Sequence, residues 1–335
     1  MKAFVTGATG FVGSAVVRSL VHRGVDVRVL ARPSSDLRNV GGLSVELVFG
    51  DLLDEDGLGK VLSGCDTLYH VAAFYSTAEA EIRKMYEVNV RGTKNILRAA
   101  LNAGVRRAVH TSTIGTIGQP RGESLATEDV PFSQWESASH YAKSKYLGEV
   151  AALNMCAAGL SLVVVNPSAP VGPRDIKPSS TGERILDYLH GREPSFVSGG
   201  INFISVKDVA EGHLLAAEKG SAGERYILGH HDGNLQLPGF LELMERVSGL
   251  RAPSLVDHSG SRHMLRRVLS TLRLAAAASS KIRDPASDRR PTALTCDPSK
   301  AIRELGLPQT PLDDAFAGAV SWFRKNGYVK PREQA

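Results

Sequence analysis

The chain has 335 residues, of which 42% are apolar and 22% charged, and its formal net charge is +5, an ordinary balance for a globular protein. Basic residues concentrate over 262–290 without interleaved aromatic residues, so we expect no nucleic-acid partner. The three cysteines, Cys65, Cys156 and Cys296, lack metal-ligand spacing and predict neither a disulfide framework nor a metal site.

A strand and a glycine turn open the chain. Residues 2–13 read KAFVTGATGFVG, and an amphipathic helix over 11–23 follows. Strand, turn and helix in this order are the context that a dinucleotide-binding glycine motif requires. Gly7 permits the turn, Gly10 lets the backbone approach a pyrophosphate, and Gly13 lets the helix pack closely on the strand. The positive end of the helix then faces the phosphates.

The position of this strand in the chain also bears on where in the cell the protein is expected. It begins at residue 3, and no apolar run in the chain reaches membrane-spanning length. We therefore expect no signal peptide, no stable membrane insertion and a cytoplasmic protein.

Strands and helices alternate through the first half of the chain. Apolar β-branched runs predict strands over 3–6, 26–31, 44–49, 67–71, 107–111 and 161–166. Amphipathic patterns predict helices over 11–23, 54–62, 82–103 and 141–158. Continuous rather than alternating apolar strands are typical of a sheet that helices cover on both faces. The fold class is therefore α/β, a Rossmann-type doubly wound parallel sheet with ligands at the carboxyl ends of its strands.

The pattern changes after about residue 170, where Pro170, Gly172, Pro173 and Pro178 interrupt regular structure. Helices are predicted over 182–190, 206–219, 238–248, 262–278, 298–305 and 311–325, and strands over 202–205 and 226–228. We expect residues 1–170 to form the NAD(P)-binding domain, with a segment of about 202–230 interleaved. Residues 171–335 would form mainly a smaller, mostly helical substrate lobe.

Tyr141 and Lys145 form the second strong pattern. Residues 141–145 read YAKSK, and positions four apart lie on one face of a helix. A nearby ammonium favours the phenolate, so Lys145 is expected to lower the pKa of Tyr141. Tyr141 can then act as a general acid or base near neutral pH. The hydroxyls of HTST, residues 110–113, end a strand and can hydrogen-bond a substrate oxygen beside the tyrosine.

Several motifs together resemble the extended short-chain dehydrogenase/reductases, the NAD-dependent epimerase/dehydratase family. They are TGATGFVG at 6–13, HVAA at 70–73, NVRGT at 89–93, HTST at 110–113, YAKSK at 141–145 and NPSAPVGPRD at 166–175. NFISVKDVAEGHLLAAEKG at 202–220 and DPSKAIRELG at 297–306 also look like that family, so the resemblance spans essentially the whole chain. The branch it resembles contains dihydroflavonol-4-reductase-like and hopanoid-associated sugar epimerase-like proteins.

The resemblance implies roles for individual residues. Tyr141 would be the catalytic acid/base, Lys145 would also bond the nicotinamide ribose, and Thr113 would supply the catalytic hydroxyl, with Ser112 as the alternative. Asn89 would support the central helix near the site, and Asn89 and Arg174 are candidate substrate-side residues. The implied cofactor contacts are Gly7, Thr9, Gly10, Phe11, Val12, Gly13, Arg32, Ser35, Asp51, Leu52, His70, Val71, Ala72, Ala73, Thr111, Ser112, Tyr141, Lys145, Pro167 and Ser168.

Arg32 indicates which cofactor is bound. An acid that binds a ribose 2′-hydroxyl is expected at the end of the second strand, where this chain has Arg32. A guanidinium can hold a 2′-phosphate through paired charge-assisted bonds. We therefore expect a preference for NADP(H), with NAD(H) possible.

Two enzymatic functions and one binding function stay open. An NADPH-dependent reductase of a ketone or aldehyde, or the reverse alcohol oxidation, would release its cofactor each cycle. A nucleotide-sugar epimerase or dehydratase would keep NAD bound, and a cofactor-sensing regulator would not turn over at all. Ala142 and Ser144 resemble the reductase branch, whereas the 166–175 motif resembles the epimerase-like branch. We also expect a homodimer, since the helices over 82–103 and 141–158 commonly pair between subunits in this superfamily.

Overall fold

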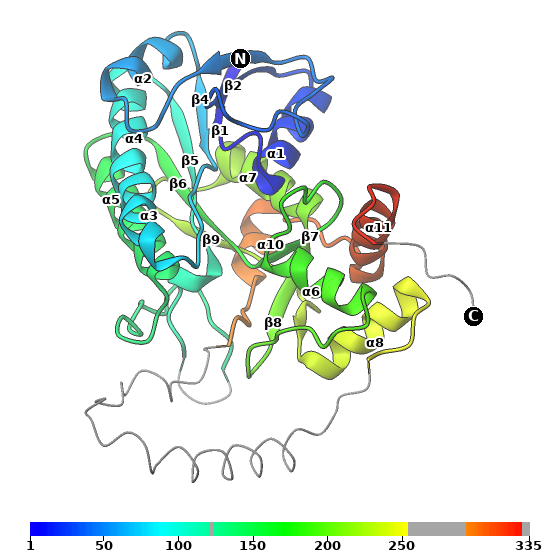
Figure 1. The fold of residues 1–335 in the computed structure, drawn as a ribbon. Coiled ribbons are helices and arrows are strands. Elements are labelled where there is room, and N and C mark those ends of the chain that lie inside the picture. Colours follow the sequence, from blue (N-terminus) through cyan, green and yellow to red (C-terminus); the bar gives the residue numbers. More distant parts are fainter. Residues whose placement is uncertain (121–123, 254–292, 330–335) are drawn as a thin grey trace, which may run out of the picture.

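The computed structural model describes residues 1–120, 124–253 and 293–329 (Figure 1). The helix expected over 262–278 and the basic residues over 262–290 lie outside these ranges. Among the helices that the structure describes, none is both long enough and apolar enough to span a lipid bilayer.

A seven-stranded sheet forms the centre of the larger part of the molecule, and every strand pair in it is parallel. Its spatial order is β3 (Glu46–Phe49), β2 (Asp26–Ala31), β1 (Lys2–Thr6), β4 (Thr67–His70), β5 (Arg107–Thr111), β6 (Leu162–Pro167) and β9 (Arg225–Leu228). The order reverses between β1 and β4, which is the crevice where ligands bind in such sheets. The predicted Rossmann-type fold is confirmed.

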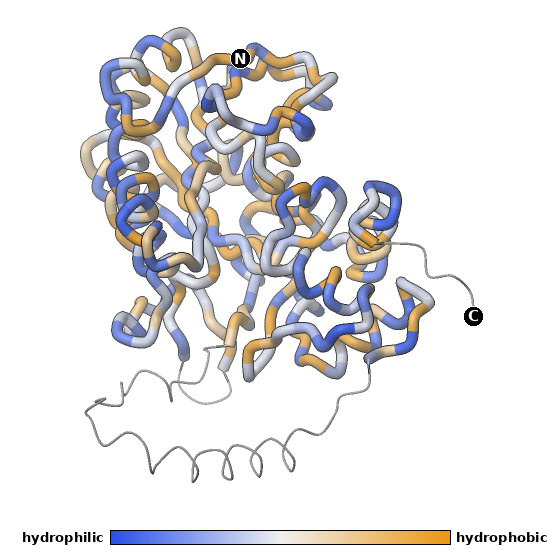
Figure 2. The backbone as a smooth tube through the Cα atoms, viewed as in Figure 1, coloured by the Kyte–Doolittle hydropathy of each residue, from blue (hydrophilic) through white to orange (hydrophobic). Residues whose placement is uncertain are grey.

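Helices cover both faces of this sheet, and they bury its apolar strands (Figures 1 and 2). One core lies between the sheet and α1 (Phe11–His22) and α7 (Val206–Lys219). The other lies beneath α2 (Glu55–Leu62), α4 (Thr93–Asn102) and α5 (His140–Ala157). Short helical turns lie at η1 (Glu79–Glu81) and η3 (Ile114–Thr116).

The helix expected over 82–103 is present, but it is not α-helical throughout. It comprises α3 (Ile82–Tyr86), a π-helical turn η2 (Glu87–Gly92) and α4. The side chain of Asn89 explains the wider turn, because it bonds the backbone of Phe74 and the hydroxyl of Ser144 instead of facing solvent.

The second lobe contains a small sheet as well as helices. Its strands are β10 (Asn234–Leu235), β8 (Ile201–Ser205) and β7 (Ala169–Val171), of which β7 and β10 had not been predicted. Its apolar core joins β8 with α6 (Ser180–Leu189), α8 (Leu237–Ser248) and α11 (Leu312–Lys325). The helix α10 (Ser299–Leu305) packs instead on the larger part, against α7 and β9. Within the segment 202–230, β8 therefore joins the small sheet, whereas α7 and β9 return to the large one.

Candidate functional site

The glycine turn after β1 brings three backbone segments into close contact. Gly7 has a φ of +70°, and a Cβ added there would lie 2.6 Å from the backbone nitrogen of Ala72. A Cβ on Gly13 would lie 2.1 Å from the carbonyl oxygen of Gly7. Both distances are too short for any side chain, so the close approach of this turn to the loop after β4 and to the start of α1 requires glycine at positions 7 and 13.

The N-terminus of α1 is left open to a ligand. Gly10 is its N-cap and is exposed, no side chain caps the helix, and its first turn contains no acidic residue. Thr9, Phe11 and Val12 around it are half-buried. Free N–H groups and a positive helix end are the donor set that a diphosphate requires. These residues therefore fit the dinucleotide that the motif predicts.

Next to this turn, the His70 ring at the end of β4 is bonded within the protein and supports the glycine turn. Its ring is completely buried between two hydroxyls, with Nδ1 2.8 Å from Thr6 Oγ1 and Nε2 2.9 Å from Thr93 Oγ1. The Thr93 hydroxyl donates to the Asn89 carbonyl, so Nε2 is the protonated nitrogen and Nδ1 accepts from Thr6. Burial lowers the pKa of His70 to about 3. That His70 contacts the cofactor stays a prediction, and its buried ring supports the turn; Val71, Ala72 and Ala73 after it are half-buried or exposed.

Lys145 lies beneath Tyr141 on α5. Ser139 caps this helix by accepting from the Ala142 N–H, which sets the register that places Tyr141 one turn before Lys145. The Lys145 ammonium is buried and donates to the carbonyl oxygen of Thr111 at 2.7 Å. Desolvation lowers the pKa of Lys145 to about 8.

The phenol of Tyr141 differs from the sequence-based expectation. Desolvation, with a smaller contribution from the neighbouring Tyr75 phenol, raises the pKa of Tyr141 to about 12. The rings of Tyr75 and Tyr141 meet edge to face with centroids 5.1 Å apart. The expected lowering of the Tyr141 pKa is therefore wrong for this arrangement, because burial of the phenol, which opposes the charged phenolate, sets the net direction of the shift. Tyr141 keeps its proton at neutral pH.

The two hydroxyls at the end of β5 have different surroundings. Ser112 is buried, and its hydroxyl lies 3.1 Å from Thr116 Oγ1, within the protein interior. Thr113 is half-buried, and its Oγ1 accepts only a 3.3 Å bond from the Gly115 N–H. A Cβ placed on Gly115 would lie 3.6 Å from Thr113 Cγ2 and 3.8 Å from Ala142 Cβ, so Thr113 borders the start of α5. Thr113 is therefore the less buried of the two hydroxyl residues, and its catalytic role stays a prediction.

Glu149 connects the functional helix to the strand ends, and no sequence motif had singled it out. Its carboxylate is buried and accepts from Thr116 Oγ1 at 2.7 Å and Asn166 Nδ2 at 2.9 Å. Arg225 on β9 forms a 3.1 Å ion pair with its other oxygen. The sequence could have indicated Glu149 by its position four residues after Lys145, since the two residues share one face of the helix.

Several predicted cofactor residues are buried or have side chains that bond other residues, and their role at the cofactor stays a prediction. Thr111 is buried, and its hydroxyl lies 2.8 Å from His213 Nε2. Pro167 is buried at the end of β6, and the Ser168 hydroxyl donates to Asn202 Oδ1 at 3.0 Å. Asn89 is buried, and its amide donates to Ser144, which itself donates to the Tyr141 carbonyl, so Asn89 supports α5 as expected.

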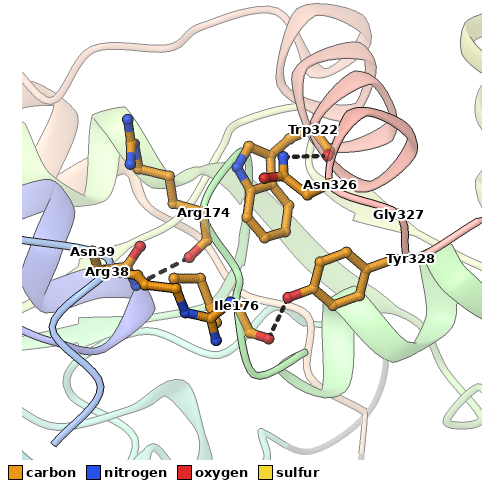
Figure 3. A pocket seen from close by; sticks show the side chains of 8 residues that line it. All are labelled: Arg38, Asn39, Arg174, Ile176, Trp322, Asn326, Gly327 and Tyr328. Atoms are coloured by element: carbon orange, nitrogen blue, oxygen red, sulfur yellow. Dashed lines mark hydrogen bonds between the residues drawn. The ribbon is translucent and has the colours of Figure 1, made fainter. Parts of the chain in front are cut away.

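Other predicted residues lie at the ends of β2 and β3. Arg32 is exposed, and its guanidinium has no hydrogen bond or ion pair with any residue that the structure describes. Ser35 closes the turn after β2 by accepting from the Arg32 N–H at 3.0 Å. Asp51 is exposed and Leu52 is buried after β3. Arg174, the other substrate-side candidate, lines a separate pocket with Arg38 and Trp322 (Figure 3).

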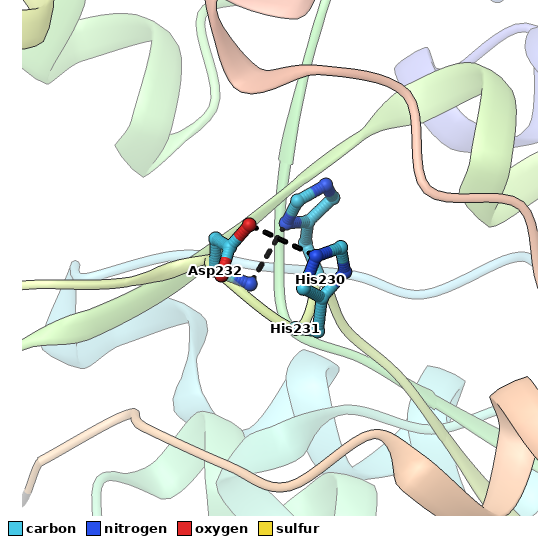
Figure 4. Close-up of side chains that lie close together, drawn as sticks. All are labelled: His230, His231 and Asp232. Carbon is cyan, nitrogen blue, oxygen red and sulfur yellow. Dashed lines mark hydrogen bonds and ion pairs between the residues drawn. The ribbon is translucent and has the colours of Figure 1, made fainter.

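Among the described residues, one group has the composition of a metal site: His230, His231 and Asp232, after β9 (Figure 4). The two imidazole rings are stacked, with centroids 4.6 Å apart and an angle of 19° between their planes. Imidazole binds a metal through a lone pair in the plane of the ring, and nearly parallel rings do not direct these lone pairs at one point. His230 Nδ1 also accepts from the Asp232 N–H. This cluster carries no metal assignment.

Comparisons with known proteins agree with this geometry. The chain is 40% identical over 331 residues, 98% of its length, to a Synechocystis sp. protein that carries the provisional name dihydroflavonol 4-reductase, of which 96% is covered. It is 37% identical to the sterol demethylase protein B of Methylococcus capsulatus, with 98% of this chain and all of that protein covered. The crystal structure of gox2253 superposes with a TM-score of 0.84 at 38% identity, covering 98% of this chain and 99% of that one.

The family model that matches residues 3–229 covers the glycine turn, Thr113, Tyr141 and Lys145, so most of the chain and its whole candidate site fall within the match. The chain is an NAD(P)-dependent oxidoreductase of the short-chain dehydrogenase/reductase type and belongs to the NAD dependent epimerase/dehydratase family.

Proposed function

We propose that this chain reduces a ketone or aldehyde to an alcohol with NADPH, and catalyses the reverse oxidation, through Thr113, Tyr141 and Lys145. The observation that carries the proposal is their placement. Tyr141 and Lys145 lie one turn apart on α5, and Thr113 borders the start of that helix at the carboxyl edge of the sheet. The uncapped N-terminus of α1 faces the same edge.

The bound nicotinamide supplies the hydride that reduces the carbonyl carbon. Tyr141 donates its phenolic proton to the carbonyl oxygen, and the Thr113 hydroxyl donates a hydrogen bond to the same oxygen. The raised pKa of Tyr141 keeps the acid protonated until that oxygen becomes basic. The phenolate that results is stabilised by the Lys145 ammonium, which has N–H groups left after its bond to Thr111.

The cofactor preference of the proposal rests on Arg32. Its guanidinium follows β2, is exposed, and has no partner among the described residues, so it can bind a 2′-phosphate without breaking another bond. We expect Arg32→Met to lower kcat/KM for NADPH by about 10- to 100-fold, the size of a charge-assisted hydrogen bond, with kcat/KM for NADH nearly unchanged. Steady-state kinetics with both cofactors measure this.

Arg32→Lys is the matched control, since it keeps the charge and loses the paired geometry. It should retain part of the NADPH preference. An equal loss for both cofactors in Arg32→Met, or a wild-type preference for NADH, would contradict the assignment.

The family also includes epimerases and dehydratases, which makes retained NAD the second candidate. The experiment that separates them is mass spectrometry of small molecules released from the purified protein, followed by NADPH oxidation with a panel of aldehydes and ketones. We expect little retained cofactor and measurable NADPH oxidation. Tightly retained NAD would favour the epimerase or dehydratase reaction, and NADPH binding without turnover would favour a regulator.

A further inference from the structure

A pocket of about 380 Å³ lies where the loop after β2 meets the second lobe (Figure 3). Arg38 and Asn39 line it from the nucleotide-binding part, and Arg174 lines it from the loop after β7. Trp322 on α11 and Tyr328 after that helix form the remaining wall. Tyr141 and Lys145 are not among its lining residues, so this pocket is separate from the reacting groups.

Hydrogen bonds between its walls hold the pocket in shape. The Asn39 amide donates to the carbonyl of Arg174 at 3.2 Å and to the carbonyl of Thr9, in the glycine turn, at 3.1 Å. The Tyr328 hydroxyl donates to the Ile176 carbonyl at 2.7 Å, as Figure 3 shows. Arg174 has a φ of +76°, an uncommon backbone state for a residue with a side chain. Such strain persists where surrounding contacts fix it, and it is enriched at binding sites.

The pocket is rich in positive charge. The Arg174 guanidinium has no hydrogen bond or ion pair with any residue in the described ranges. Burial is the larger cause that lowers the pKa of Arg18, and the positive charge of Arg174 is the smaller one. Arg38 is paired only with the exposed Asp36, at 2.5 Å. A second carboxylate nearby, Asp175, is buried and accepts from Ser179.

Cations outnumber carboxylates around this pocket. The cations are Arg18, Arg38, Arg174 and Lys177, and the carboxylates are Asp36, Asp175 and Glu183, of which Asp36 and Asp175 already accept bonds from the protein. The remaining positive charge of the pocket can be balanced by a bound anion. The Trp322 ring offers a flat apolar wall beside it, which suits a phosphate carried on an aromatic or nucleoside group.

We propose that this pocket binds a phosphate monoester, with Arg174 and Arg38 as its charged ligands and Trp322 beside the group that carries the phosphate. Two sources share this chemistry. Asn39 connects the pocket to Thr9, and Arg38 follows Arg32 by six residues, so the 2′-phosphate of NADP(H), held by Arg32 together with the pocket arginines, is one source; this arm rests on the proposed function. A separate phosphorylated molecule is the other source, and that arm holds whatever the reaction is.

The test compares Arg174→Met with Arg174→Lys in the full chain. Dissociation constants for NADPH and NADH come from cofactor fluorescence. Binding of phenyl phosphate to NADPH-saturated wild type comes from calorimetry. If the site takes the 2′-phosphate, Arg174→Met weakens NADPH binding by about tenfold, the worth of a charge-assisted bond, and leaves NADH binding unchanged. If the ligand is separate, NADPH binding stays the same, while phenyl phosphate binds wild type and not Arg174→Met.

Arg174→Lys should retain most of the affinity that Arg174→Met loses, for NADPH or for phenyl phosphate. Arg303 is an exposed arginine on α10, and Arg303→Met should bind both ligands like the wild type. The proposal is overturned if phenyl phosphate does not bind wild type and Arg174→Met leaves the ratio of NADPH to NADH affinity unchanged. Equal weakening of both cofactors without phenyl phosphate binding also overturns it. The measurement on wild type does not depend on any variant folding. Absence of NADPH binding would contradict the proposed function alone, because calorimetry of phenyl phosphate with the wild type without NADPH still tests the pocket.

Discussion

Tyr141→Phe is expected to lower kcat for carbonyl reduction by about a thousandfold, within the range of a lost general acid. The phenyl ring keeps its edge-to-face contact with Tyr75 and its place on α5, so the site keeps its shape. Only the proton that reaches the substrate oxygen is lost. Cofactor affinity should change by less than about threefold, since one hydroxyl bond of modest net strength is removed. Stopped-flow or steady-state NADPH oxidation and a fluorescence titration measure the two quantities.

Tyr146→Phe is the matched control on the same helix. Tyr146 is half-buried and stacks on Phe132 with centroids 4.5 Å apart, so its ring contributes packing rather than chemistry. Its kcat should equal the wild-type value. If Tyr141→Phe retains more than a tenth of wild-type kcat, Tyr141 is not the proton donor and the proposed mechanism fails.

Residue spacing predicted the parts of this site that are local in the chain. Gly7, Gly10 and Gly13 occupy the turn and helix start that their spacing indicated, and a Cβ at Gly7 or Gly13 would collide with backbone. Tyr141 and Lys145 share a face of α5 because four residues span about one helical turn. The order of apolar strands was sufficient for the parallel sheet, since crossover handedness leaves few alternatives.

What spacing did not predict depends on contacts between distant segments. The Ser112 hydroxyl lies against Thr116 Oγ1, to which the Asn166 amide also donates, so the burial of Ser112 depends on segments that residue spacing does not place. The direction of the Tyr141 pKa depends on how deeply the phenol is buried, which no helical pattern reveals. The pocket at Arg174 needs Asn39 and Trp322, and the loop after β2 and the helix α11 that carry them meet only in the folded chain.

Glu149 is the clearest case of a residue whose importance the fold alone reveals. Its carboxylate holds Thr116 beside the end of β5, Asn166 on β6 and Arg225 on β9, so one side chain joins three strand ends to α5. Glu149→Leu leaves the Arg225 guanidinium, only 20% exposed, without its partner. It also removes one acceptor from each of two buried donors, the Thr116 hydroxyl and the Asn166 amide. We expect the free energy of unfolding to fall by about 3–5 kcal/mol, the usual cost of breaking one side of a buried ion pair.

Urea denaturation followed by circular dichroism measures this loss, and two further variants show its cause. Glu149→Gln keeps the shape and one acceptor oxygen, so it should lose clearly less stability than Glu149→Leu. Glu304→Leu, on the exposed side of α10, should change stability by less than about 0.5 kcal/mol. If Glu149→Leu is as stable as wild type, the network does not hold the strand ends. If it is destabilised but its kcat at low temperature is unchanged, Glu149 holds the fold without positioning Thr113 and Tyr141. A fall in kcat with KM preserved, partly restored in Glu149→Gln, is what the geometry predicts.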